Sequence, residues 1–113
     1  MIEAFMRRSY TMVINVRDKA EKFYCQIKVL DLKRETDTKY RISMSGSDEV
    51  GKSKLDGLLV LRADGFGFKL SKVYDDRSKA EQTGKFDILL YEGAGNPDTV
   101  SGEWAFYGYE TST

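Results

Sequence analysis

The chain has 113 residues, of which 41% are apolar and 32% charged, and we read residues 1–113 as a single domain. A chain of this length buries roughly two-thirds of its surface on folding and needs no disulfide to do so. Its 18 basic and 18 acidic residues cancel, which excludes the overall basic excess that drives general nucleic-acid binding. Nucleic acid is therefore not the expected partner, although a local basic patch is compatible with zero net charge.

The composition also bears on the cellular compartment. Cys25 is the only cysteine, which excludes an intrachain disulfide and favours a reducing environment. No apolar run approaches the roughly 18 residues of a membrane-spanning helix. The first residues lack the apolar segment and cleavage site of a signal peptide. We therefore expect a cytoplasmic protein with no membrane partner.

Apolar and polar residues alternate along most of the chain, which is the pattern of half-buried strands. Residues 2–8 are open to either a short helix or an additional strand. The remaining segments predict strands, in chain order, at 10–16, 23–29, 40–44, 58–63, 66–70, 86–90 and 100–108.

The segments between these strands read as turns, because they are polar or rich in glycine and serine. Asp64-Gly65 is the strongest hairpin signal, since both central positions of a type I′ turn need positive φ. The stretch Gly93-Ala94-Gly95 lacks the context of a phosphate-binding loop and reads as part of a hairpin loop. The other predicted turns are 18–21, 33–38, 45–55, 75–84 and 92–98.

This order of elements predicts an all-β fold. With about seven to eight strands and no βαβ alternation, a single antiparallel meander forms a small up-and-down barrel, or else a small sandwich. Glycines within the predicted strands, at Gly67, Gly102 and Gly108, favour the barrel because a closed sheet needs places where the backbone bends or approaches closely.

The stretch GFGF at residues 65–68 copies the middle of the RNP1 signature, in which strand aromatics stack on RNA bases. Asp64 stands where that signature has a base, and Lys69 where it has valine. The two helices of an RNA-recognition motif are also missing from the pattern. We therefore predict that Phe66 and Phe68 point into the core, with single-strand binding by exposed aromatics as the alternative.

Catalytic sites are restricted mainly by exclusion. The chain has no histidine, which removes histidine-based triads and most zinc sites. Cys25 shares the apolar phase of its strand and reads as a core thiol. Asp87 and Glu103 interrupt apolar strands, so a two-carboxylate hydrolase stays open in principle, but we favour the explanation that both acids face water on the outer side of the sheet. The other acids that we considered lie in predicted turns, where solvated carboxylates are expected: Asp48, Glu49, Asp75, Asp76 and Asp98. We expect no enzyme, no cofactor and no metal.

Several tyrosines lie in the phase opposite to the main apolar set of their strands, namely Tyr24, Tyr91, Tyr107 and Tyr109. A second aromatic face serves a ligand cavity or a protein interface. It also fits a plain outer surface, because tyrosine suits strands.

Gly102-Glu103-Trp104 resembles the Gly-x-Trp motif of calycin-type barrels, the lipocalins, fatty-acid-binding proteins and avidins. In lipocalins the motif lies on the first strand, whereas here it lies on the last. The chain is also similar to the small β-barrel domain of bacterial antiphage effectors that respond to cyclic nucleotides, although those effectors attach the barrel to membrane helices. This resemblance implies a pocket for an anionic nucleotide, with Arg62 and Arg41 as phosphate partners.

Two functions follow from this reading. The first is a non-enzymatic barrel that binds a small, nucleotide-like ligand in its interior or mouth. The second is an interaction module or inhibitor that presents its aromatic face or a sheet edge to a protein partner, with homodimer formation as one version. The residues expected at a ligand site are Trp104, Phe66, Phe68, Phe106, Arg62, Arg41 and Tyr107.

Overall fold

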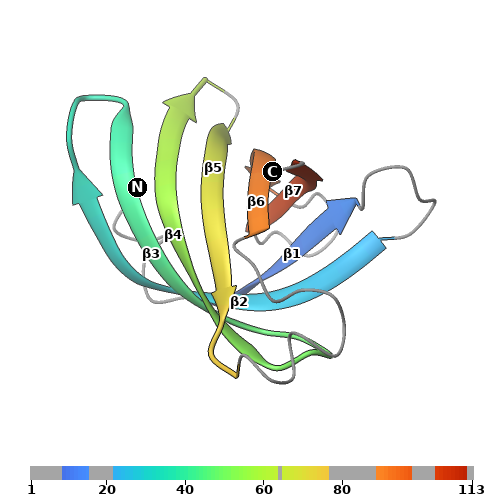
Figure 1. The fold of residues 1–113 in the computed structure, drawn as a ribbon. Helices are drawn as coiled ribbons and strands as arrows, with labels where there is room; N and C mark the ends of the chain where they lie inside the picture. Colours follow the sequence, from blue (N-terminus) through green and yellow to red (C-terminus); the bar gives the residue numbers. More distant parts are fainter. Residues whose placement is uncertain (1–8, 16–21, 64, 77–88, 98–103, 112–113) are drawn as a thin grey trace.

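A computed structural model describes residues 9–15, 22–63, 65–76, 89–97 and 104–111, with side chains at 96, 97, 104 and 105 outside the description. These residues form one closed β-barrel in the order β1 to β7 (Figure 1). The all-β barrel predicted from the alternation is confirmed. Its strands are β1 Ser9–Asn15, β2 Lys22–Arg34, β3 Lys39–Ser47, β4 Lys52–Arg62, β5 Gly65–Tyr74, β6 Leu89–Pro97 and β7 Trp104–Thr111.

Six of the seven strand pairings are antiparallel meander contacts, and the seventh closes the barrel. β1 pairs with β7 in parallel, with Met12 opposite Phe106 and Asn15 opposite Tyr109. The parallel closure follows from the odd number of strands. Consecutive strands of a meander alternate in direction, so the first and the seventh run the same way.

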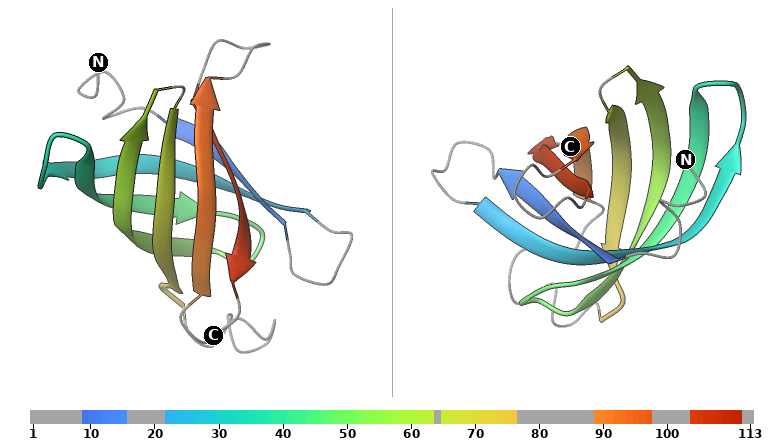
Figure 2. Two further views of the ribbon diagram at one scale, coloured as in Figure 1. Left: turned by 90° about the horizontal axis from the view of Figure 1, so that it is seen from above. Right: turned by 180° about the vertical axis from the view of Figure 1, so that it is seen from behind.

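The strands are strongly tilted around the barrel. β4, β5 and β6 cross β2 and β3 at a steep angle (Figure 2). The register shows the same tilt, because a row of paired residues that starts at Lys22 of β2 runs once round the barrel and returns to Lys33 of the same strand. Such tilt is what closing a small number of strands requires.

The interior is filled by the inward side chains of all seven strands. Phe106 is fully buried, and its ring lies 4.9 Å from that of Phe66 and 5.3 Å from that of Phe68, between ring centroids. Gly95 is required here, since a Cβ at that position would lie 1.9 Å from Cζ of Phe66. Both GFGF phenylalanines are 3% exposed, so the prediction that they point into the core is confirmed.

Two predicted turns are wrong. Much of 45–55 is strand, because β3 runs to Ser47 and β4 begins at Lys52, which leaves only residues 48–51 as the turn. Residues 92–97 belong to β6, so Gly93-Ala94-Gly95 is strand rather than hairpin loop. Serine and glycine suggested turns in both places, but serine suits the outer sheet face and glycine suits crowded positions in a closed barrel.

The predicted ends and phases also need correction. β2 extends to Arg34, so Lys33 and Arg34 belong to a strand rather than to the turn expected at 33–38. Tyr91 is buried and Leu90 is 39% exposed, the reverse of the expected phase. The inward set of β6 continues from Tyr91 through glycines, which carry no apolar signal. The predictions for residues 2–8, Asp64, Asp87, Asp98, Gly102 and Glu103 fall outside the described residues.

We expect Phe106→Ala to lower the free energy of unfolding by about 3–5 kcal/mol, because it removes a fully buried ring from the three-phenylalanine contact. Urea denaturation monitored by circular dichroism measures the loss. Tyr107→Ala, one residue along the same strand and 45% exposed, is the matched control and should cost much less. Equal losses for the two variants would contradict the assigned inward phase of β7.

Candidate functional site

One end of the barrel interior is polar, in contrast to the phenylalanine-filled remainder. This end contains the C-terminal end of β3, the N-terminal end of β4 and the C-terminal end of β5. Six residues gather there, and we call them the polar mouth: Cys25, Asp48, Ser53, Lys72, Tyr74 and Tyr91.

Lys72 is the central residue of the polar mouth. It follows Phe66, Phe68 and Leu70 on the inward face of β5, and its side chain is fully buried. Its Nζ lies 2.5 Å from Oδ2 of Asp48 and 4.0 Å from Sγ of Cys25. Three aromatic rings surround this ammonium, with centroids at 4.5 Å (Phe23), 4.5 Å (Tyr74) and 5.4 Å (Tyr91). Such rings attract a cation through their electron-rich faces.

Asp48 reaches Lys72 from the short turn between β3 and β4. Its Oδ2 also accepts a hydrogen bond from the Tyr74 hydroxyl at 2.9 Å. Its Oδ1 accepts bonds from the backbone N–H groups of Val50 at 2.9 Å and Gly51 at 3.3 Å. Gly51 has φ of +146°, a conformation that favours glycine. The prediction that Asp48 is a solvated turn acid is wrong, because the turn carries its carboxylate into the mouth.

The same turn brings an apolar residue to the barrel end. Val50 is 8% exposed and forms a small cluster with Tyr74 and the partly buried Leu89. Leu89 also packs against the main core, so it links the small cluster to that core. The turn therefore covers the mouth with a carboxylate and an aliphatic side chain two residues apart.

Burial and charge set the protonation of these groups. Burial by itself raises the pKa of Asp48, but the hydrogen bond and charge of Lys72, with the hydrogen bonds from Tyr74 and Val50, bring it below its ordinary value of 3.8. Burial raises the pKa of Tyr74, and the Asp48 hydrogen bond raises it further. Burial likewise raises the pKa of Tyr91 and of the Cys25 thiol. At neutral pH the six residues of the polar mouth thus hold one carboxylate, with their hydroxyls and thiol protonated. The charge of Glu110, which lies opposite Tyr91 in the β6–β7 ladder, adds to the rise in the pKa of Tyr91.

Two buried hydroxyl groups in the mouth have no hydrogen-bond partner within the described part of the chain: Ser53 Oγ and Tyr91 Oη. Ser53 and Cys25 converge over Gly46, where a Cβ would lie 2.6 Å from Oγ of Ser53 and 3.0 Å from Sγ of Cys25. A buried polar group without a partner costs free energy, so these two hydroxyls make the mouth a candidate binding site.

The structure separates the residues expected at a ligand site. Phe66, Phe68 and Phe106 meet in the apolar core. Arg62 is exposed on the outer face, where its guanidinium lies over Gly67. Arg41 is also outside, and its Nε pairs with Oε1 of Glu35 at 2.7 Å.

The last two expected residues lie on β7. Tyr107 is 45% exposed on the outer face. Trp104 pairs with Pro97 in the β6–β7 ladder, and its side chain lies outside the description. The phenylalanines and the arginines that were expected to share one pocket therefore lie on opposite faces of the barrel wall.

Sequence reasoning missed the residues of the polar mouth. For Lys72 a signal existed, since extending the alternation of 66, 68 and 70 by one step places a lysine on the inward face. Nothing in the sequence marks Asp48 as its partner, because their contact joins a turn and a strand 24 positions apart.

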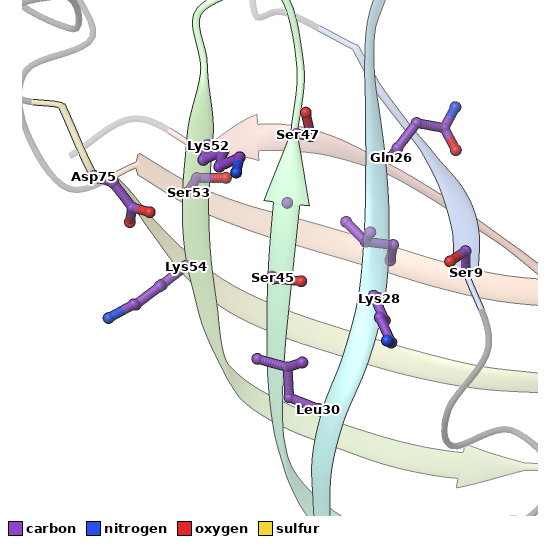
Figure 3. A pocket seen from close by; sticks show the side chains of 12 residues that line it. Ser9, Gln26, Lys28, Leu30, Ser45, Ser47, Lys52, Ser53, Lys54 and Asp75 are labelled. Atoms are coloured by element: carbon purple, nitrogen blue, oxygen red, sulfur yellow. The ribbon is translucent and has the colours of Figure 1, made fainter.

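A groove follows β3 on the outer face, with a volume of about 410 Å³ (Figure 3). Ser45 and Ser47 form its floor on β3, with Lys28 on the β2 side and Lys52 and Lys54 on the β4 side. Within the described structure none of these three lysines pairs with a carboxylate, unlike Lys69, which lies 3.6 Å from Glu92. Asp75 is the acid that lines the groove. The neutral chain thus carries a local basic surface beside the turn that holds Asp48.

A second outer feature is a row of uncharged residues that crosses six strands in register. Tyr24 is opposite Val13 and Val13 is opposite Tyr107. Tyr24 is 58% exposed and Tyr107 45% exposed, which agrees with the predicted outward phase of these tyrosines. We call this the outer apolar row, and its members are Tyr24, Val13, Tyr107, Ala94, Gly67 and Val60.

Comparison of the chain with protein-family models, curated proteins and solved structures finds no match. Across the described ranges, no three His, Cys, Asp or Glu side chains gather as metal ligands. The same residues include no helix long and apolar enough to cross a membrane. Arguments about function therefore start from the geometry of the barrel.

The ion pair predicts a specific pH dependence. Because the pKa of Asp48 is lower in the folded than in the unfolded state, its contribution to stability is present above pH 3.8 and is lost as the pH falls through the folded value. We expect Asp48→Asn to cost about 3–5 kcal/mol at pH 7, since it leaves Lys72 buried without a counter-charge. The difference from the wild type should shrink below about pH 4. Urea titrations at several pH values measure it, and a difference that stays constant with pH would contradict the assignment.

Proposed function

We propose that the protein is a non-enzymatic β-barrel that binds a small anionic ligand at the polar mouth. The observation that supports this most directly is the buried Lys72 ammonium. Its carboxylate partner among the described residues comes from a turn, and it lies beside two buried hydroxyls without hydrogen-bond partners. Ligand sites combine apolar walls with a few convergent polar groups, and this mouth has both.

The chemistry of the mouth favours binding over reaction. The Cys25 thiol stays protonated near neutral pH because burial raises its pKa. Asp48 is held as a carboxylate by its donors and is a poor base. What the mouth offers is a cation, hydroxyl donors and aromatic rings. These groups suit a ligand that joins an anionic group to a flat body, and a nucleotide-like molecule is one such ligand.

The calycin-like and antiphage-effector resemblances of the sequence belong to this proposal. The closed seven-stranded barrel is compatible with either. Under either resemblance a ligand would occupy the barrel. Lys72 would then be the partner of the ligand's anionic group, the role that the sequence had suggested for Arg62 and Arg41. A reducing cytoplasmic location agrees with the single buried cysteine.

Native mass spectrometry of the freshly purified protein tests this function. We expect a retained small mass, or an increase in thermal stability with adenosine monophosphate, inorganic phosphate or hexanoate. The double variant Lys72→Met/Asp48→Asn removes both charges with little change of volume, so it should fold and lose the effect. Full retention of binding by that variant would refute the mouth as the site. The absence of both a retained mass and any stabilisation of the wild type would refute ligand binding.

A second candidate function is protein interaction through the outer apolar row. The row places two half-exposed tyrosines on β2 and β7, on either side of Val13, and Tyr109 is 52% exposed nearby on β7. Tyrosine is enriched at protein interfaces because it offers a large apolar area with a polar tip. Homodimer formation is the form of this function that can be tested with the purified chain alone, without a second protein.

We expect sedimentation velocity to report association of the wild type and a monomer for the double variant Tyr24→Ser/Tyr107→Ser. Leu30→Ser is the matched control, because Leu30 is 59% exposed at the β2 bulge and lies outside the row. Loss of association in Leu30→Ser as well would indicate nonspecific hydrophobic association and would contradict the outer apolar row as the interface. A monomeric wild type at every concentration would remove the homodimer version.

A further inference from the structure

We infer that the Asp48 carboxylate occupies the place of the ligand's anionic group, and that the β3–β4 turn swings away when the ligand binds. The ligand is then a compact carboxylate or phosphate attached to a flat apolar body. This inference rests on the proposed ligand-binding function and specifies how the site opens and what chemistry fills it.

Lys72 belongs to a strand that is held in the sheet on both sides, whereas its counter-charge, Asp48, belongs to a turn that can move. Lys72 lies inside β5, which is paired on both sides, to β4 and to β6. Asp48 belongs to a turn closed by the Ser47–Lys52 pair, and its own N–H donates to the Gly51 carbonyl at 3.1 Å. Moving this turn breaks its local bonds and the contacts of Asp48 and Val50, but leaves the ladders of the barrel intact. Short turns of this kind supply the low-stability openings of folded proteins.

The turn presents a carboxylate and an apolar side chain together, as an amphiphilic anion would. Its carboxylate contacts Lys72 and Tyr74, and two residues later Val50 forms a cluster with Tyr74, against which Leu89 packs. When the turn leaves, it uncovers a cation and an apolar wall side by side. Aromatic rings near the ammonium, those of Phe23, Tyr74 and Tyr91, favour a flat molecule that can stack on them.

The unpartnered hydroxyls indicate that a ligand uses the mouth more fully than Asp48 does. One oxygen of Asp48 is engaged by backbone N–H groups of the turn, so one oxygen remains for the mouth donors. Ser53 and Tyr91 keep hydroxyls that Asp48 does not reach. A ligand carboxylate or phosphate is free of the turn and brings additional acceptor oxygens, which explains why donors are buried there without partners.

The basic groove supplies an approach for such a ligand. Lys52 begins β4 immediately after the turn, and Lys28 and Lys54 continue the basic surface along the same three strands (Figure 3). Their positive potential raises the local concentration of anions next to the element that must move. Asp75 lies in the same groove and limits the effect at one side.

Chemical rescue tests the placement of the anion. In Asp48→Ala the carboxylate is gone, and we expect added acetate to raise the melting temperature saturably by about 5 °C, at constant ionic strength with chloride. Glu49→Ala, in the same turn but on an exposed acid, should show no saturable rise. Lys72→Met/Asp48→Ala should also show none. Asp48→Ser, which keeps one acceptor oxygen for the turn N–H groups but vacates the carboxylate position, provides the same readout if Asp48→Ala does not fold.

The wild type tests the opening of the turn. We expect benzoate and phenyl phosphate to stabilise it and neutral benzamide to leave it unchanged, with the stronger of the two anions identifying the headgroup. Stabilisation by benzamide equal to that by benzoate would overturn the anionic requirement. A variant without Asp48 that acetate does not rescue would overturn the placement of the anion even if native mass spectrometry finds a retained ligand. That outcome separates failure of this inference from failure of the proposed function.

Discussion

A lysine ammonium enclosed in a small barrel requires a counter-charge, and the arrangement at this end of the molecule depends on that requirement. An unpaired buried charge would cost several kcal/mol even after relaxation. β5 places Lys72 inside because its alternation is fixed by Phe66, Phe68 and Leu70. At this end the inward positions of β2, β4 and β6 carry Cys25, Ser53 and Tyr91, none of which is an acid. Glu110 of β7 lies opposite Tyr91 in the ladder, and the acid that pairs with Lys72 in the described structure is Asp48. It comes from the β3–β4 turn, and this dictates where Asp48 and Val50 lie.

The barrel interior is consequently divided into two parts with different physical roles. The larger part is a dry core of aromatic and aliphatic side chains, in which Phe106 contacts both phenylalanines of the GFGF stretch. Area burial there supplies the stability of the fold. The smaller part holds charges, hydroxyls and a thiol, and it contributes less to stability because its desolvation costs offset much of the attraction. Polar groups retained at such a cost are candidates for function rather than for folding.

The fold could be predicted from the sequence because the signal is local. Alternation along residues such as Met12, Ile14, Cys25 and Ile27 sets the inward face, and all four are buried. The errors in the predicted strand boundaries arise where a residue type is common both in turns and in strands. Serines at 45 and 47 resemble a turn but line the outer groove, and glycines 93 and 95 resemble a loop but relieve crowding inside β6. The site could not be predicted in the same way, since it depends on which turn folds over which strand.

The polar mouth has two explanations, one structural and one functional, and they predict different hydrogen bonding. A buried ion pair can serve only to specify the register of a fold, and then every donor near it should be satisfied, because an incomplete polar network is worse than none. The Asp48–Lys72–Tyr74 contacts meet that standard. The hydroxyls of Ser53 and Tyr91 do not, although each is 1% exposed and lies in the same mouth. This network satisfies the carboxylate of Asp48 but leaves the hydroxyls of Ser53 and Tyr91 without acceptors. It is better suited to an anion that offers more oxygen atoms than the Asp48 side chain does. For this reason we propose that the closed turn is one state of a ligand-binding site and not only a contact that stabilises the fold.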